Sequence, residues 1–246
     1  MLYGIISDIH GNLEAAIAAK DFLHKNRVEK ILVLGDVVGY GVNPEECIEL
    51  FESLQATFIK GNHEEAIITG SYDVFAMDAR ISIEWTGKHL RQALKEKIAG
   101  WKTIIEMEDF ILCHGGLIDP LNFYTNSRSK AKRMFDEFEF KICFIGHTHF
   151  PMAFSIAEGQ ELPIVISQEP GGRMRILMAE DKRHIINAGS VGQPRDGNPD
   201  ACCGIYDTES RTFELHRISY PVEIAAKKIL DAGLPSSLAA RISRGL

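Results

Sequence analysis

The sequence lacks a pattern of paired cysteines. It has five cysteines, an odd number, and none of them belongs to a CxxC pair. Three of the five lie in apolar runs, where small thiols are usually buried. A disulfide framework or a zinc ribbon would need a more regular set, so both are disfavoured. We therefore expect reduced, buried thiols at Cys47, Cys113, Cys143, Cys202 and Cys203.

Long apolar runs are also missing from the sequence. No stretch approaches the ~18–20 apolar residues that a membrane-spanning helix requires. The amino-terminal stretch MLYGIISDIHG has no basic segment followed by a long apolar one, so a signal peptide is not expected. Together with the cysteine pattern, this predicts a cytoplasmic protein with no membrane partner.

An excess of positive charge is absent as well. The formal net charge is -7 over 246 residues, which argues against stable nucleic-acid binding, because that binding depends on Lys and Arg neutralising phosphates. A small anionic substrate remains compatible, since a bound cation can dominate the local field. No linker, repeat or low-complexity tract divides the chain. We expect a single domain over 1–246, closed by a helix and tail at about 221–246, in an oligomeric state that the sequence leaves open.

The hydrophobic pattern changes along the chain. Up to about residue 60, apolar runs alternate with amphipathic stretches, which predicts a β-α-β-α-β opening with parallel strands. After residue 152, short alternating segments predict antiparallel strands joined by turns. Helices are expected at about 78–98, 129–138 and 221–231, with a poorly ordered helix beyond Pro235. Later strands are expected at 110–113, 142–145, 163–167, 173–178, 184–187, 201–207 and 212–219.

A polar, glycine-bearing turn follows each of five apolar runs. In parallel sheets, sites gather outside the carboxyl ends of the strands, which would bring these turns into one crevice. The turns present carboxylate, imidazole and amide groups, a borderline donor set that suits Mn, Fe, Zn, Co or Ni. Seven ligands are too many for one tetrahedral ion but fit two ions that share a carboxylate. The candidates are Asp8, His10, Asp36, Asn62, His114, His147 and His149.

Each of these turns has an ordinary structural explanation when it is taken alone. Single DxH, GD or GH dipeptides are common in turns, so the metal hypothesis depends on five of them in order at strand ends. Glu64 and Glu65 either orient a neighbouring side chain or are plain surface charges. We expect a structural role, and no role in the site, for the remaining histidines and the two tryptophans: His24, His89, His184, His216, Trp85 and Trp101.

The five turns SDIH, GD, GNHE, CHGG and GHTH together resemble the blocks of the calcineurin-like metallophosphoesterase superfamily. The resemblance covers residues 4–150, and NAGSVGQPRDGNP at 187–199 is similar to the tail motif of the small single-domain bacterial and archaeal phosphodiesterase branch. It implies an α+β fold, a β-sandwich of two facing mixed sheets flanked by α-helices. This agrees with the parallel and then antiparallel pattern of the strands.

The resemblance also implies residue roles in a centre of two divalent ions. Asp8, His10, Asp36 and His149 would hold one ion, and Asp36 would bridge to a second ion held by Asn62, His114 and His147. His63 is left beside the substrate as the general acid, so the catalytic residues would be His63, Asp36 and Asn62.

One departure from the family pattern narrows the range of substrate classes that we expect. Protein phosphatases and diadenosine tetraphosphatases of this superfamily continue the second block as GDxxDRG, whereas this chain has GDVVGYG, with Gly39 and Tyr40 in place of Asp-Arg. Contacts to the substrate are instead expected from Tyr40, Ser190 and Arg195. The leading hypothesis is a phosphodiesterase for small nucleotide-like substrates. The alternatives are a phosphomonoesterase, a dinucleoside polyphosphate hydrolase and a non-catalytic scaffold.

Overall fold

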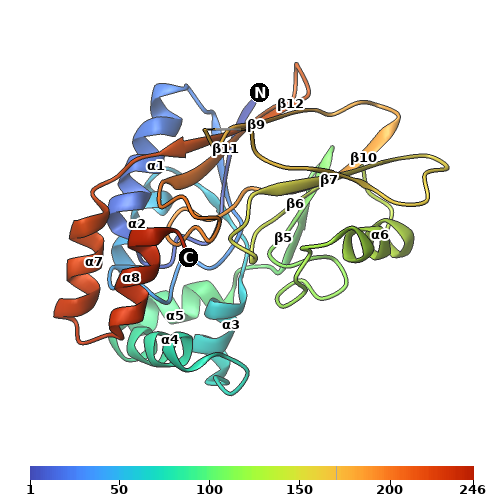
Figure 1. Cartoon of the computed structure of the whole chain (residues 1–246). Coiled ribbons are helices and arrows are strands. Elements are labelled where there is room, and N and C mark those ends of the chain that lie inside the picture. Colours follow the sequence, from blue (N-terminus) through green and yellow to red (C-terminus); the bar gives the residue numbers. More distant parts are fainter. Residues whose placement is uncertain (170) are drawn as a thin grey trace.

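Two six-stranded β-sheets face each other in the computed structural model, which describes residues 1–169 and 171–246 (Figure 1). The first sheet has, in spatial order, β3 (Thr57–Phe58), β2 (Lys30–Val33), β1 (Leu2–Ile6), β11 (Ala201–Asp207), β12 (Thr212–Ile218) and β9 (Met174–Leu177). The second sheet has β4 (Ile104–Glu106), β5 (Phe110–Cys113), β6 (Ile142–Ile145), β10 (Lys182–Asn187), β7 (Met152–Ala157) and β8 (Ile164–Ile166).

Strand direction follows the pattern expected from the sequence. Strands β1, β2 and β3 are parallel to one another. The later strands pair mainly antiparallel, as in the ladders of β11 with β12 and of β7 with β10. Strand β10 is also parallel to β6, so both sheets are mixed. The expected fold of two facing mixed sheets flanked by helices is therefore confirmed.

Helices cover the outer face of each sheet. α1 (Leu13–Lys25) and α2 (Pro44–Ser53) pack on the first sheet, and α6 (Arg128–Glu137) packs on the second (Figure 1). The space between the sheets is filled by apolar side chains such as Ile5, Phe144 and Phe213. All four residues of β6 are buried, because this strand lies between that core and α6. Burial on both faces explains its unbroken apolar run.

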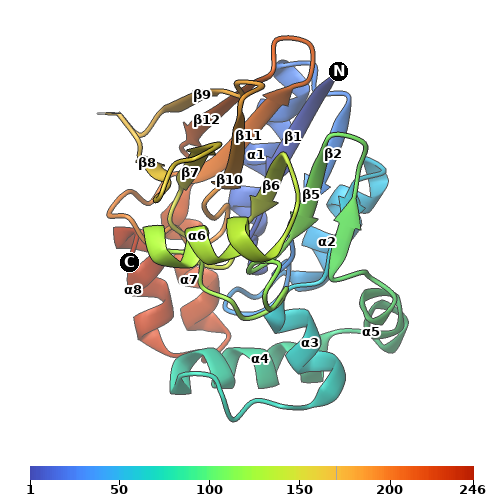
Figure 2. The same cartoon turned by 90° about the vertical axis from the view of Figure 1, so that its right-hand side faces the viewer.

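The remaining helices gather at one end of the sheets (Figure 2). They are α3 (Asn62–Thr69), α4 (Met77–His89), α5 (Gln92–Ala99), α7 (Val222–Asp231) and α8 (Ser236–Arg244). The prediction of a single helix at 78–98 is wrong. The segment forms two helices, α4 and α5, because the backbone is extended at Leu90 and Arg91 between them. This break lets the Leu90 side chain enter the core beside α1, α2 and α5, while the backbone N–H of Arg91 donates to Glu45.

The carboxyl-terminal tail is more ordered than the sequence suggested. α8 buries Leu238, Ala239 and Ile242 against α7 and neighbouring side chains. All five cysteines are buried free thiols, as expected. Among the described residues, no helix combines the length and the apolarity needed to cross a membrane.

Candidate metal centre

The loops that carry the candidate ligands meet at one end of the two sheets, beside the carboxyl ends of their parallel strands. Asp8 follows β1, Asp36 follows β2, and His114 directly follows β5. Since β1 is parallel to β2 and β5 is parallel to β6, these strand ends come together. The structure brings the predicted ligands together in three groups, one of which also contains His63, a residue not predicted as a ligand. Asn62 joins them through a 3.1 Å contact between its Oδ1 and His114 Nε2. The groups are Asp8, His10 and His149; His10, Asp36 and His63; and Asp36, His114 and His147.

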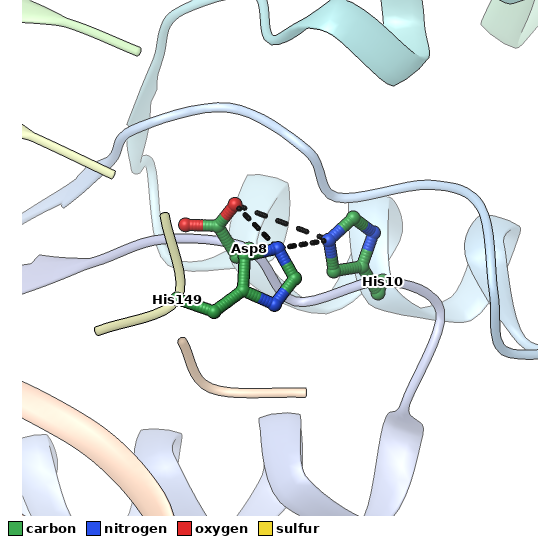
Figure 3. A group of neighbouring side chains, drawn as sticks. All are labelled: Asp8, His10 and His149. Carbon is green, nitrogen blue, oxygen red and sulfur yellow. Dashed lines mark hydrogen bonds and ion pairs between the residues drawn. The ribbon is translucent and has the colours of Figure 1, made fainter. Parts of the chain in front are cut away.

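The two aspartates use their oxygens in the same way. Asp8 Oδ2 accepts a hydrogen bond from the backbone N–H of His147 at 3.1 Å, and Asp36 Oδ1 accepts one from His63 N–H at 2.9 Å. The second oxygen of each carboxylate faces imidazole rings. Asp8 Oδ1 lies 3.3 Å from His149 Nε2 (Figure 3), and Asp36 Oδ2 lies 3.3 Å from His114 Nε2. Each carboxylate is therefore fixed on one side and available to a cation on the other.

The histidine rings are oriented by backbone carbonyls. The Nδ1 atoms of His10, His114 and His149 lie 3.0, 2.7 and 2.6 Å from the carbonyl oxygens of Val38, Leu34 and Gln193. A carbonyl oxygen only accepts, so each Nδ1 carries a proton and each Nε2 is the nitrogen that faces the site. The Nε2 atoms of His10 and His149 are only 3.1 Å apart (Figure 3). Two facing lone pairs at this distance suit a shared cation.

Unpartnered polar atoms support the same conclusion. Asp8 Oδ1 and His147 Nε2 are buried and have no hydrogen-bond partner among the described residues. A buried polar atom without a partner is costly, so these two atoms are suited to act as donors to a cation. Carboxylate, imidazole and amide donors with fixed ring orientation fit divalent transition metals.

The electrostatics of the site give three of its four candidate histidine ligands the neutral state that metal binding requires. Burial lowers the pKa of His10 and His149 well below the usual range, and it lowers the pKa of His147 to about 3. Burial alone would lower the pKa of His114 too, but the adjacent Asp36 carboxylate raises it to about 10. The Asp36 pKa is well below normal because neighbouring imidazoles, above all His114, outweigh its burial. The site thus combines an ionised Asp36 carboxylate with neutral imidazoles at His10, His147 and His149, whereas His114 carries an extra proton beside Asp36 that a bound cation would have to displace.

Several of these ligands lie in left-handed backbone conformations. The φ angles are 53° at Asp8, 52° at Asp36, 66° at His147 and 60° at His149, and His10 is similar at 50°. Residues other than glycine rarely adopt this region, and each instance costs roughly 1–3 kcal/mol. Such strain clusters at functional sites because the surrounding structure must impose it.

Glu64 stabilises the loops that carry the candidate ligands, which we call the metal loops. Its side chain is fully buried and accepts hydrogen bonds from the backbone N–H groups of Asp36 (2.8 Å), Val37 (2.7 Å), Val38 (3.2 Å) and Gly61 (2.8 Å). Burial and the Asp36 charge raise its pKa to about 7. The surface-charge alternative is therefore wrong for Glu64. A glycine followed three residues later by glutamate is half of a capping-box pattern, and that signal is visible in the sequence.

Replacing Glu64 with glutamine should destabilise the fold. One amide oxygen cannot accept all four N–H groups, and the amide nitrogen adds donors among them. We expect the free energy of unfolding to fall by about 2–4 kcal/mol in urea denaturation. The matched control is Glu65→Gln, whose carboxylate lies at the surface and, among the described residues, pairs with Lys60 alone at 3.1 Å. Its effect should stay within about 1 kcal/mol. Equal effects of the two substitutions would contradict the role of Glu64.

A cavity of about 530 Å³ opens over the candidate ligands. His63 lies in its wall, with its ring packed against Tyr40 and Phe75 and its Nδ1 buried without a partner among the described residues.

Gly39 explains one departure from the family pattern. A Cβ at Gly39 would lie 2.1 Å from His63 Nδ1, and its φ of 81° also favours glycine. A larger residue at position 39 would displace the His63 ring.

The three residues expected at the substrate occupy different places. Tyr40 and Arg195 both line the cavity, and an Arg195 Nη2 donates to the Tyr40 hydroxyl at 3.3 Å. Ser190 does not line it. Its fully buried hydroxyl donates to the Asp8 carbonyl at 2.7 Å and accepts from Gln193 N–H at 2.8 Å. Its hydroxyl braces the loop that carries Asp8, and a contact between Ser190 and the substrate stays a prediction. The sequence analysis also missed Arg241, which lines the cavity from α8.

Comparison with known proteins identifies the family. The model of the calcineurin-like phosphoesterase superfamily domain matches residues 1–211. The chain is also 32% identical to the uncharacterized protein MJ0912 of Methanocaldococcus jannaschii, over 99% of this chain and 98% of that protein. The chain therefore belongs to the calcineurin-like phosphoesterase superfamily, as the sequence motifs suggested.

Solved structures agree with this assignment. The crystal structure of a metallophosphoesterase from Sphaerobacter thermophilus is 33% identical and superposes with a TM-score of 0.86, over 100% of this chain and 99% of that one. Hypothetical protein PH1004 from Pyrococcus horikoshii shares the fold at 15% identity, with a TM-score of 0.82 over 100% and 98% of the two chains. Family and site together define a phosphoester hydrolase with candidate His and Asp metal ligands.

Proposed function

We propose that the protein is a phosphodiesterase with a centre of two divalent metal ions that acts on small nucleotide-like substrates. The observation that carries this proposal is the position of Asp36. Its Oδ2 belongs both to the group with His10 and to the group with His114 and His147. A carboxylate shared by two sets of imidazoles supports a bridging role between two ions.

The ligands divide into two sets around this bridge. Asp8, His10 and His149 would hold one ion with Asp36. The second ion would take Asp36 together with Asn62, His114 and His147. When bound, divalent cations neutralise the charge of the phosphoryl oxygens and make hydroxide available near neutral pH.

The side chains of the cavity wall perform the remaining steps. His63, whose Nε2 is 3.9 Å from Asp36 Oδ2, is the proposed general acid that protonates the leaving oxygen. Arg195 lies beside Tyr40 and has no carboxylate partner among the described residues, so its guanidinium is available to orient a phosphate oxygen. Phe75 and Ala76 line the same cavity and exclude water from one side of it.

Diester rather than monoester hydrolysis is supported by the extent of the cavity. Besides Asn62 and His147, its lining includes the aromatic side chains of Phe75 and Tyr124 and Arg241 of α8. Its volume of about 530 Å³ leaves room for organic groups on both substituents of the phosphorus.

The direct test compares two chromogenic esters on protein that has been stripped with a chelator. Mn, Fe, Zn, Co and Ni are restored one at a time, and bis(p-nitrophenyl) phosphate is compared with p-nitrophenyl phosphate. We expect no turnover without metal and, with the best metal, a kcat/KM at least about tenfold higher for the diester, a preference worth ~1.4 kcal/mol. A preference for the monoester would favour the phosphomonoesterase alternative, and no turnover with any metal would contradict the proposal.

A further inference from the structure

The carboxyl-terminal hairpin of α7 and α8 forms part of the active-site wall. It lies outside residues 1–211, the part that the family model matches. α8 is held in place at both ends, because the Ser237 hydroxyl donates to Asp78 on α4 and the Gly197 N–H donates to the Gly245 carbonyl at 2.8 Å. Figure 1 shows the hairpin beside α4. The hairpin therefore contributes to the wall of the site from outside the matched domain.

α8 brings a second guanidinium into the cavity. Arg241 lines it together with Arg195, and Asp36 is the single carboxylate among the lining residues. Neither arginine has a carboxylate within 4.0 Å in residues 1–169 and 171–246, unlike Arg80 and Arg91 on the outer surface. Two uncompensated positive charges in one wall indicate an anionic ligand.

The two arginines are held differently. Arg195 is fixed by hydrogen bonds to the Tyr40 hydroxyl (3.3 Å) and to Gln193 Oε1 (3.0 Å), and these contacts hold it beside the candidate metal ligands. The partly buried guanidinium of Arg241 makes no side-chain hydrogen bond to any described residue. Its donors are therefore available to the ligand, and a planar guanidinium fork matches phosphate oxygens.

We propose that Arg241 forms a second anion subsite and that the natural substrate is a phosphodiester that carries an additional phosphate group. The scissile phosphate lies at the metal loops and Arg195, the organic part contacts Phe75 and Tyr124, and the additional phosphate reaches Arg241. Arg241 is thus a specificity-determining residue contributed by the hairpin. This inference rests on the proposed phosphodiesterase function of the same site.

The test uses two esters that differ by one phosphate. Both are thymidine 5′-(p-nitrophenyl phosphate) diesters with the same leaving group, and one also carries a 3′-phosphate. For the wild-type protein, kcat/KM should be about 10- to 100-fold higher on the 3′-phosphorylated ester, as expected for one charge-assisted contact. In Arg241→Gln this ratio should fall to near one, and Arg241→Lys should restore part of it. The matched control is Arg244→Gln, which removes the same charge from an exposed position of α8 outside the cavity and should keep the wild-type ratio.

Binding gives a readout that is independent of turnover. Calorimetric titration with thymidine 3′,5′-bisphosphate and thymidine 5′-monophosphate should show a preference for the bisphosphate that Arg241→Gln abolishes. If both esters are hydrolysed but the ratio is near one, or Arg244→Gln lowers it equally, the subsite is refuted while the phosphodiesterase function stands. If neither ester is hydrolysed, the phosphodiesterase function fails, and the binding preference alone decides whether Arg241 forms an anion subsite.

Discussion

Replacing Asp36 with asparagine is expected to remove both metal ions and to lower kcat/KM by more than about 10³-fold, since each 1.4 kcal/mol of lost charge stabilisation costs a factor of ten. The side chain is isosteric, and its Oδ1 can still accept the hydrogen bond from His63 N–H. What disappears is the negative charge at Oδ2, the atom that faces His10, His63 and His114.

Metal content measured by mass spectrometry, beside the turnover of bis(p-nitrophenyl) phosphate, tests this expectation. The matched control is Asp21→Asn, an exposed carboxylate that pairs with Lys20 at 2.7 Å, and it should keep wild-type metal content and activity. If Asp36→Asn retains one ion per chain with high affinity, Asp36 is not shared between two ions. If it retains both ions, Asp36 is not an essential ligand.

Replacing His63 with alanine is expected to lower kcat by about 10²–10⁴-fold on an alkyl phosphodiester, whose leaving group needs a proton. The loss should be much smaller on a p-nitrophenyl ester, because p-nitrophenolate leaves without protonation. Metal content should remain unchanged. The asymmetry between the two substrates distinguishes an acid from a residue that only shapes the cavity.

The competing role for His63 is metal coordination, since His63 also lies near Asp36 and His10. Loss of an ion in His63→Ala would establish that role instead. Equal losses of kcat on the two esters would remove the general acid assignment. His24→Ala, on the exposed end of α1, serves as the control and should behave as the wild type in both measurements.

The positions of the candidate metal ligands follow from the sequence because each one lies at the end of a local pattern. A short apolar run followed by a glycine-bearing turn defines a strand end, and the parallel arrangement of β1 and β2 and of β5 and β6 fixes the edge at which those ends meet. Residues far apart in the chain therefore converge for a reason that the sequence itself contains. The alternating pattern after residue 152 likewise predicts antiparallel strands.

Residues whose role depends on distant contacts were not predictable in this way. In the sequence, Glu64 resembles an ordinary surface charge in the first turn of a helix. It is buried because the backbone of Asp36 to Val38 folds onto it. Arg241 lies in a short segment after Pro235 with no motif around it. Its place in the cavity depends on how α8 packs against α7 and α4. The break at Leu90 has the same origin, since the inward turn of this residue is set by the core that it enters.

The left-handed φ angles at the metal loops also govern how this site can be altered experimentally. Asparagine and aspartate tolerate that conformation better than most side chains because their short polar groups bond locally. An asparagine at Asp8 or Asp36 therefore changes charge with little added backbone penalty. A β-branched residue at the same position would combine loss of the donor with a conformational clash, and its phenotype would confound chemistry with misfolding.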